Sequence, residues 1–318
     1  MKAKEWFKDF GKGAVLGTGI LPGVSVGTVG IIVGIYDKLL SAINDLRHHF
    51  GKAFLRLLPI ALGCIIAAVI LLIGQKFLYD SMQFEITALF AGFILGGLPV
   101  ILFELRERKF SLADIARVAA GFVVAAGIGI MSVVADKYFG IDLLSAFLDP
   151  NANWWVYPVT FVVGFVAAVA CILPGISGSM VLFIFGLYNP VVDLFIGNQS
   201  MFANHDRIGT GLLLTFILLV GVIAGLFTIS KLMVGLMKKH HRGTFTVVMG
   251  FVLGSIIAMF VNNQIWNSYS KFQWWDYLIG AVLFLAAVIV LTILIVRNHK
   301  KILVESTAET SIKTSEKK

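Results

Sequence analysis

A short segment occurs twice in this chain, and each copy interrupts a long apolar run. The first copy reads LPGVSVGT at residues 21–28, and the second reads LPGISGSM at residues 173–180. Proline lacks a backbone N–H and disfavours helix in the residue before it, while glycine adopts backbone conformations that other residues avoid. Each copy therefore predicts a helix that breaks and resumes inside an apolar segment. Ser25 and Ser177 are favourable N-cap residues for the helix after each break.

The similarity continues downstream and gives the chain an internal repeat. Gly34 aligns with Gly186, and a further echo pairs GFILG at residues 92–96 with GFVLG at residues 250–254. A GxxxG pattern suits close helix contact, although it is a weak signal on its own. Broken helices at matching positions of two repeats are typical of the binding site of a membrane transporter.

The composition is that of a polytopic membrane protein. Hydrophobic residues make up 58% of the 318 residues and charged residues only 14%, whereas a soluble domain carries about 25% charged residues. The formal charge of +8 could indicate a nucleic-acid partner, but the basic residues lie between apolar runs, where membrane orientation accounts for them. We therefore expect a phospholipid bilayer and no nucleic acid as the partner. Cys64 and Cys171 lie in separate apolar runs and are interpreted as packing residues.

The apolar runs predict an all-α membrane fold of two inverted-topology repeats. In each half, a broken or re-entrant hairpin precedes three runs near or above the length needed to span a bilayer. The first repeat is predicted at 1–140, with its hairpin at 13–40 and spans at 54–75, 86–103 and 112–135. The second is predicted at 141–301, with its hairpin at 154–196 and spans at 210–236, 244–262 and 275–297. Residues 302–318, rich in Ser, Thr, Lys and Glu, predict a disordered cytoplasmic tail.

The span count predicts how the two hairpins face each other. Because three spans follow a hairpin that enters and leaves on one side, the second hairpin must enter from the opposite side. With the N-terminus inside, nearly all basic residues fall on the cytoplasmic side, as the positive-inside rule requires. The basic residues left outside are Lys76, Lys137, Arg207 and Lys271. Both termini are therefore predicted to be cytoplasmic, and the two hairpin tips to meet near the membrane midplane.

The meeting point of the tips is suited to an anionic group. Each helix that starts after Pro-Gly-x-Ser directs free backbone N–H groups and the positive end of its dipole at the tip. No Asp or Glu occurs in the middle of a predicted span, so a cation pathway lacks its usual ligands. The candidate substrate-binding residues are Pro22, Gly23, Ser25, Gly27, Thr28, Pro174, Gly175, Ser177, Gly178 and Ser179. The alternative is that both motifs only kink packed helices, which does not explain their matching positions. No catalytic residue, cofactor or metal site is predicted.

In these motifs the chain resembles a bacterial family of polytopic membrane proteins, the polyprenyl-phosphate transporters. The resemblance covers most of the chain and is most specific from Leu21 to Asp37 and from Leu173 to Tyr188. The family usually has Gly after the Ser of the first motif, where this chain has Val26. The resemblance implies a flippase that returns undecaprenyl phosphate from the outer to the inner leaflet of the bacterial cell membrane. This lipid is the carrier used in cell-wall synthesis.

Two arginines at the cytoplasmic ends of predicted spans, Arg56 and Arg117, are candidate guides for the phosphate once it arrives inside. Ordinary positive-inside anchoring explains both residues as well. Asp114, three residues before Arg117, also offers that arginine a local helix pair.

Other functions stay open at this point: transport of another lipid phosphate or anion, a structural role, and an integral polyprenyl-pyrophosphate phosphatase. Those phosphatases also carry Pro-Gly-x-Ser in inverted repeats, but with an Arg after the Ser and an acidic pair nearby. Here Val26 and Gly178 occupy the Arg position, and the close acidic pair Glu104 and Glu107 lies in a charged loop. We therefore predict no enzyme activity. The sequence leaves open whether the chain forms a homo-oligomer.

Overall fold

The computed structural model describes residues 3–35, 38–39, 41, 50–106, 109–139, 154–172, 177–196, 200, 202–203, 206 and 208–315. All regular structure in these residues is helical. Within them, six segments are long and apolar enough to cross a membrane: Ala53–Ser81, Gln83–Leu105, Leu112–Tyr138, Ile208–Leu226, Lys239–Trp266 and Trp274–His299. The chain is therefore a multi-pass membrane protein, as its composition predicted.

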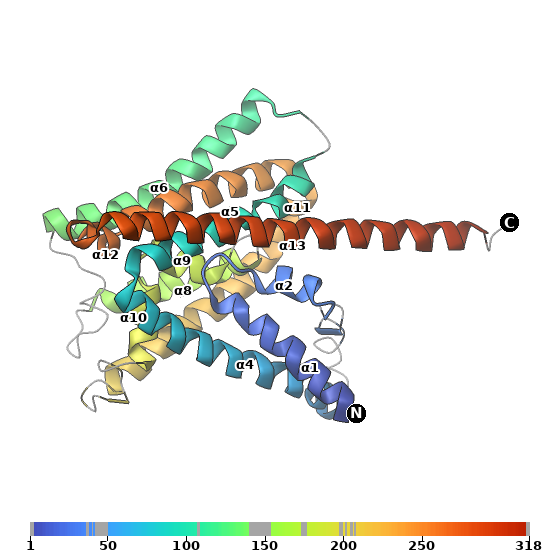
Figure 1. The fold of residues 1–318 in the computed structure, drawn as a ribbon, viewed down its shortest axis with the longest axis horizontal. Coiled ribbons are helices and arrows are strands. Elements are labelled where there is room, and N and C mark those ends of the chain that lie inside the picture. The colour runs from blue at the N-terminus through green and yellow to red at the C-terminus, as the bar shows by residue number, and fades with distance from the viewer. Residues whose placement is uncertain are drawn as a thin grey trace.

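The first half of the chain begins with a broken helical segment, followed by three long helices (Figure 1). The broken segment consists of α1 (Ala3–Leu16), the 3-10 helix η1 (Gly17–Ile20) and α2 (Val26–Ile32). The long helices are α4 (Phe50–Ser81), α5 (Gln83–Leu105) and α6 (Leu112–Phe139). The three spans predicted for this half lie inside these helices.

The second half starts with a second broken segment, made of α8 (Val156–Ile172), α9 (Gly178–Ile184) and α10 (Tyr188–Phe195). It continues through α11 (Ile208–Val261), α12 (Asn263–Trp266), η3 (Tyr269–Lys271) and α13 (Trp274–Ser315). These elements contain the three spans predicted for this half. The one residue of these spans outside a helix is Asn262, the predicted end of the second span, which lies between α11 and α12.

Two features of the second half differ from the prediction. The spans predicted at 210–236 and 244–262 are joined without a loop, since α11 runs through both and only His240 leaves helical geometry, with φ −134° and ψ 39°. The predicted disordered tail from residue 302 is instead a continuation of α13 to Ser315. Neither segment, 237–242 or 302–315, contains a proline or glycine that would break a helix, and extending an existing helix avoids the cost of nucleation.

The two halves exchange their last spans. α13 packs along α5, and the second part of α11 (241–261) packs along α6. Likewise α1 packs along α4, and α8 along the first part of α11 (208–239). Under the internal repeat, each contact of one half has its counterpart in the other. The contacts between the halves therefore follow the internal repeat of the sequence.

Glycines make the exchanged contacts possible. An ideal Cβ on Gly250 would lie 1.9 Å from the carbonyl oxygen of Val118, and one on Gly254 would lie 2.3 Å from that of Phe122. A Cβ on Gly92, in the other copy of the motif, would lie 2.5 Å from the carbonyl oxygen of Phe284. Both GxxxG faces therefore form the close helix contacts that the sequence predicted.

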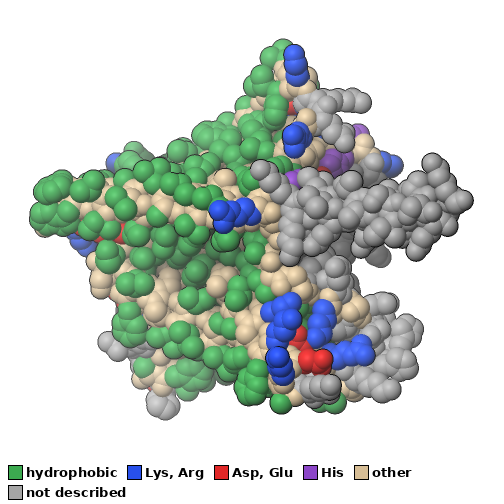
Figure 2. Space-filling model, turned by 45° about the vertical axis from the view of Figure 1, so that its right-hand side comes forward, with side chains coloured by type: hydrophobic (Ala, Val, Ile, Leu, Met, Phe, Trp, Pro, Cys, Tyr) green, Lys and Arg blue, Asp and Glu red, His purple; other side chains and the backbone are tan. Residues whose placement is uncertain are grey.

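The ends of the molecule differ in character. The N- and C-terminal ends both lie toward the right-hand side of Figure 1. On the face seen in Figure 2, Lys and Arg side chains gather toward that side, beside a broad apolar surface. Large apolar side chains on the long helices, such as Ile70 of α4 (63% exposed) and Val290 of α13 (55% exposed), project outward, as lipid-facing residues do.

Candidate functional site

The first helix break reaches the middle of a membrane span. Pro22 is buried, and Gly23 adopts a left-handed backbone with φ +86°. An ideal Cβ on Gly23 would lie 2.7 Å from the backbone nitrogen of Ile94, so the break packs directly against α5. Ile94 is the central residue of α5. The tip of the first broken segment therefore lies level with the centre of an apolar span, and polar backbone groups in such surroundings need internal partners or a ligand.

The second break approaches the centre of the other half. Ser177 precedes α9 with an extended backbone, φ −109° and ψ 138°. The next turn of this break contacts the second part of α11, because Oγ of Ser255 lies 3.6 Å from Sδ of Met180. Pro174 and Gly175 lie outside the described residues. The two breaks thus contact α5 and α11, which correspond under the repeat.

Both broken segments turn again at an equivalent glycine. Gly34 has φ +64° and Gly186 has φ +70°, and the repeat aligns these two residues. An ideal Cβ at either position would meet nothing within 4 Å, so the backbone conformation, not the space, favours glycine there. At Gly186 the chain bends by 104° between α9 and α10, which makes this pair a broken span or re-entrant loop.

The two breaks open onto one cavity of about 750 Å³. The candidate residues that line it are Ser25, Ser177, Gly178 and Ser179. Most of the remaining wall is apolar, including Leu72 and Ile73 of α4. The structure therefore brings the serines of both motifs, 152 positions apart for Ser25 and Ser177, to the same cavity.

The other candidate residues have different positions. Pro22 and Gly23 support the first break but are not among the residues lining the cavity. Gly27 and Thr28 lie in the first turn of α2, and the Thr28 side chain is outside the described part of the structure.

The two arginines proposed as phosphate guides do not line this cavity either. Arg56 is exposed on α4. Arg117 donates from Nη1 to Oδ1 of Asp114 over 3.0 Å, which is the local pair that the sequence offered.

The hydroxyl groups are the main polar feature of the cavity. The side chain of Ser177 does not cap α9; its Oγ lies 2.7 Å from Oγ of Ser179 instead. α2 and α9 are each only seven residues long. Helices this short have weaker dipoles than the sequence suggested. The hydroxyls and the N–H groups of each first turn are therefore the main groups that could attract an anion to the cavity. Such donors form strong hydrogen bonds with an anion when water is scarce.

Val26, the residue that departs from the family motif, has a local structural partner. Its side chain is half exposed and lines the cavity beside Ser25. An ideal Cβ on Gly19 would lie 2.3 Å from Cγ2 of Val26, so Gly19 provides the space that the valine occupies. The extra volume at position 26 is therefore accommodated without displacing the first break.

Sequence reasoning missed a polar network beside the cavity. Tyr188, which lines the cavity, donates to Oε1 of Gln75 over 2.6 Å. Asn189 donates to Oε1 of Gln264 over 2.7 Å, which ties α10 to α12. A signal was available: Tyr188 matches Tyr36 in the repeat, and Gln75 is an isolated amide at the end of an apolar run.

An ion pair joins the second broken segment to α4. Lys76 lies 2.7 Å from Oδ1 of Asp193 on α10 and 2.9 Å from Oδ1 of Asp80. The Lys76 and Asp193 side chains are only 18% and 16% exposed. Asp193 follows the cavity-lining Val192 directly, so this pair holds α10 in place at the edge of the cavity.

Comparison with known proteins gives consistent matches over this architecture. The profile of the undecaprenyl phosphate translocase-like family matches residues 17–274. A polyprenyl-phosphate transporter of Vibrio cholerae serotype O1 is 27% identical over 272 residues, which cover 80% of this chain and 78% of the relative. A polyprenyl-phosphate transporter of Staphylococcus aureus is 30% identical over 257 residues, covering 78% of this chain and 84% of the relative. No solved structure matches the chain.

Proposed function

The chain belongs to the undecaprenyl phosphate translocase-like family, and on that premise we propose that it transports a polyprenyl phosphate across the bacterial cytoplasmic membrane. The substrate that the family description indicates is undecaprenyl phosphate. The observation that carries the proposal is the mid-depth cavity, in which Ser25, Ser177 and Ser179 face an otherwise mainly apolar wall.

This cavity suits a lipid with a single phosphate. The hydroxyls and first-turn N–H groups are donors that a phosphate can accept from, and the wall contributed by Leu72 and Ile73 suits the first isoprene units. A volume of about 750 Å³ is that of a site for a drug-sized ligand. A 55-carbon chain is larger, so its remainder stays in the surrounding lipid. The protein then shelters the head group while the tail remains in the bilayer.

The orientation and direction of transport belong to the same proposal. We place both termini in the cytoplasm, supported by their position at one end of the molecule and by the basic residues near that end. Undecaprenyl phosphate then moves from the outer to the inner leaflet, which returns the carrier for another round of envelope synthesis.

The phosphatase alternative has less support. The names of the family and of both relatives indicate a transporter and not an enzyme. Among the described residues that line the cavity there is no Asp, Glu, Lys, Arg or His, which are the side chains that such a phosphatase uses for charge neutralisation and as a base. The residues after the two motif serines, Val26 and Gly178, supply no cation for a pyrophosphate.

Leaflet-resolved transport in proteoliposomes tests the proposal. Purified protein is reconstituted with undecaprenyl phosphate in one leaflet, and the lipid accessible from each side is followed with time, with and without an imposed pH or Na⁺ gradient. We expect transfer well above that of protein-free vesicles. Transfer equal to that of protein-free vesicles under every gradient overturns the proposal. Release of inorganic phosphate from undecaprenyl pyrophosphate by the same preparation would establish the phosphatase instead.

A further inference from the structure

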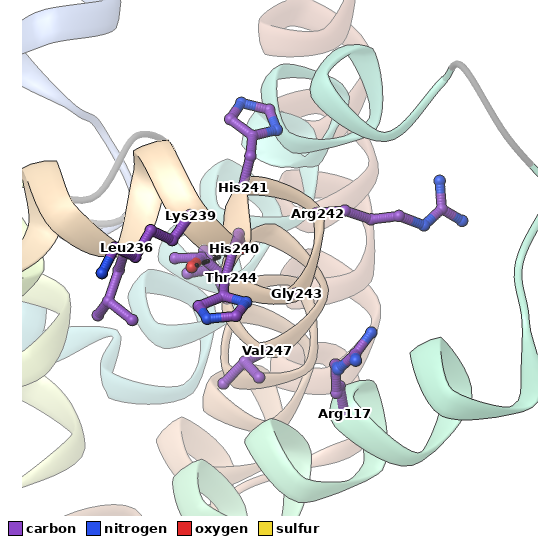
Figure 3. A pocket seen from close by; sticks show the side chains of 10 residues that line it. Arg117, Leu236, Lys239, His240, His241, Arg242, Gly243, Thr244 and Val247 are labelled. Carbon is purple, nitrogen blue, oxygen red and sulfur yellow. Dashed lines mark hydrogen bonds between the residues drawn. The ribbon is translucent and has the colours of Figure 1, made fainter.

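A second pocket, of about 640 Å³, lies where α11 breaks at His240, beside the start of α6. It is separate from the serine-lined cavity, with which it shares no lining residue. Basic side chains dominate its wall: Arg117 of α6 with Lys239, His240, His241 and Arg242 of α11 (Figure 3). We infer that this pocket binds a phosphate monoester, through Arg117, Lys239 and His240.

The break in α11 distributes its basic side chains in different directions. His240 has non-helical φ and ψ. In Figure 3, its ring lies on the same side of α11 as Arg117, whereas His241 and Arg242 point away from that side. The residues of this short basic segment therefore have two different roles.

His241 and Arg242 are engaged by neighbouring groups. Arg242 donates from Nε and Nη2 to Oδ2 of Asp114, over 3.0 and 2.8 Å, and from Nη2 to the carbonyl oxygen of Lys109 over 2.9 Å. Nε2 of His241 lies 3.3 Å from Oε2 of Glu104. These contacts hold the start of the second part of α11 against α6 and α5.

Arg117 retains donors for a ligand. Within the described part of the chain its ion pair uses Nη1 alone, toward Asp114, and its side chain is 47% exposed. The guanidinium lies over Gly243, where an ideal Cβ would be 3.6 Å from Nε and 3.8 Å from Cζ. A guanidinium has five N–H donors in a planar fork that fits phosphate oxygens. The Arg117 guanidinium therefore lies beside Gly243 in the wall of the pocket.

The remaining basic residues of the pocket are accessible. Lys239 and His240 are both exposed, and neither forms an ion pair within the described part of the chain. Arg117, Lys239 and Arg242 supply three positive charges against the two carboxylates of Asp114 and Glu104 that contact this group. The pocket thus has a positive surplus.

A phosphate monoester can engage the donors of Arg117, Lys239 and His240 more fully than a phosphodiester can, because it has one more free oxygen. A monoester carries about −1.5 to −2 charges at neutral pH and offers three free oxygens, whereas the diester of a bilayer phospholipid carries one charge. The monoester has two sources, inorganic phosphate or the head group of the transported lipid. We assign it to the lipid head group after it leaves the serine-lined cavity, and that assignment rests on the proposed function.

Binding to the full-length protein in detergent tests the inference. Isothermal titration calorimetry is carried out with farnesyl phosphate, a short prenyl monoester, and separately with inorganic phosphate. For the parent protein we expect two classes of farnesyl phosphate site. The Arg117→Gln/Lys239→Gln variant should lose one class, with affinity at least tenfold weaker, and Ser177→Ala should lose the other. Inorganic phosphate should compete only for the class that depends on Arg117 and Lys239.

Two further variants keep the test decisive. Arg106→Gln removes a positive charge from an exposed position at the same end but outside the pocket, and it should leave both classes intact. Arg117→Lys keeps the charge but loses the fork, and it should weaken the same class severalfold if the double variant does not fold. Weakening by Arg106→Gln equal to that by the double variant overturns the inference in favour of general surface attraction.

The inference and the proposed function fail in different ways. A single class of farnesyl phosphate site, lost in Ser177→Ala and unchanged in Arg117→Gln/Lys239→Gln, overturns the inference and leaves the proposed function standing. Binding of inorganic phosphate through Arg117 and Lys239 with no prenyl phosphate at the serines supports the inference and contradicts the proposed function. Absence of binding by either probe overturns both.

Discussion

Tyr188, the first residue of α10, donates a 2.6 Å hydrogen bond to Oε1 of Gln75 on α4, and both side chains are almost fully buried. The bond connects the second broken segment to the first half of the chain beside the cavity. Nε2 of Gln75 has no hydrogen-bond partner among the described residues, and the Tyr188 hydroxyl is the donor to its Oε1.

Removing this hydroxyl should destabilise the protein. Tyr188→Phe leaves the buried Gln75 amide without its donor, and we expect a loss of about 1–3 kcal/mol in the free energy of unfolding. Thermal or denaturant unfolding of the detergent-solubilised protein measures it. Tyr138→Phe, at a tyrosine that is 71% exposed, is the matched control and should change stability by less than about 0.5 kcal/mol. Equal stability of the two variants would show that the Tyr188 bond contributes nothing.

The motif serines should determine affinity for the lipid phosphate. Ser25→Ala or Ser177→Ala removes a hydroxyl donor to a charged group, which costs roughly 1.5–3 kcal/mol. That corresponds to about tenfold to a hundredfold weaker binding of a prenyl phosphate. Ser255→Ala is the control, because this buried serine donates to the carbonyl oxygen of Val252 in its own helix and does not line the cavity. If both motif variants bind as tightly as Ser255→Ala, the breaks are packing elements and the lipid binds elsewhere.

The glycine contacts between the halves should not tolerate a methyl group. Gly250→Ala places a Cβ 1.9 Å from the Val118 carbonyl oxygen, so α11 and α6 must separate. We expect a loss of about 1–3 kcal/mol, the usual cost of overpacking. The control is Gly127→Ala in the partner helix α6, where nothing lies within 4 Å of the ideal Cβ. This change should be neutral or up to about 1 kcal/mol stabilising. Unfolding of the two variants side by side distinguishes close contact from helix propensity.

The ion pair at the edge of the cavity should show strong coupling. Lys76→Met leaves Asp193 largely buried and unpaired, and should cost about 2–4 kcal/mol, below the fully buried range because both side chains are partly exposed. Lys76→Met/Asp193→Leu removes both charges and should return to within about 1 kcal/mol of the parent. A double-mutant cycle by unfolding measures the coupling. Additive effects of the two single changes would mean that the pair does not stabilise α10.

Cysteine labelling tests the proposed orientation. In a variant without Cys64 and Cys171, single cysteines replace Lys271 in η3 or Arg106 after α5, both of which are exposed. An impermeant maleimide added outside intact cells should label Lys271→Cys at once. Arg106→Cys should react only after the membrane is permeabilised. The opposite pattern would invert the orientation, and labelling of both positions in intact cells would contradict the span assignment.

Sequence reasoning could predict the features that depend on hydropathy and on the repeat. The six spans follow from apolar run length, as in α5 and α13. The helix break at Pro22 could be predicted from the backbone properties of proline and glycine. The second break, before Ser177, could be predicted because the motif is repeated there. That Ser25 and Ser177 line one cavity could be expected, because the predicted inverted repeats would place equivalent tips opposite each other.

The rest depends on contacts between residues that no local pattern connects. Hydropathy ends the first span at residue 75, yet α4 continues through Lys76 and Asp80, because Lys76 finds partners in Asp80 and on α10. The pocket at Arg117 could not be seen either. Its other residues come from α11, more than a hundred positions later, and look like an ordinary basic loop in the sequence.

The exchange of spans between the halves has a consequence for the order of assembly during synthesis. α6 carries Gly121, which lies against the carbonyl oxygen of Val247 in the finished protein. At roughly 5–20 residues per second, the ribosome needs on the order of ten seconds after Gly121 to produce its partner segment. During that time the segment that covers this glycine face has not yet been made. The first half thus waits for the second before either can become compact, and a chain that stalls in this interval presents an uncovered helix surface to its neighbours.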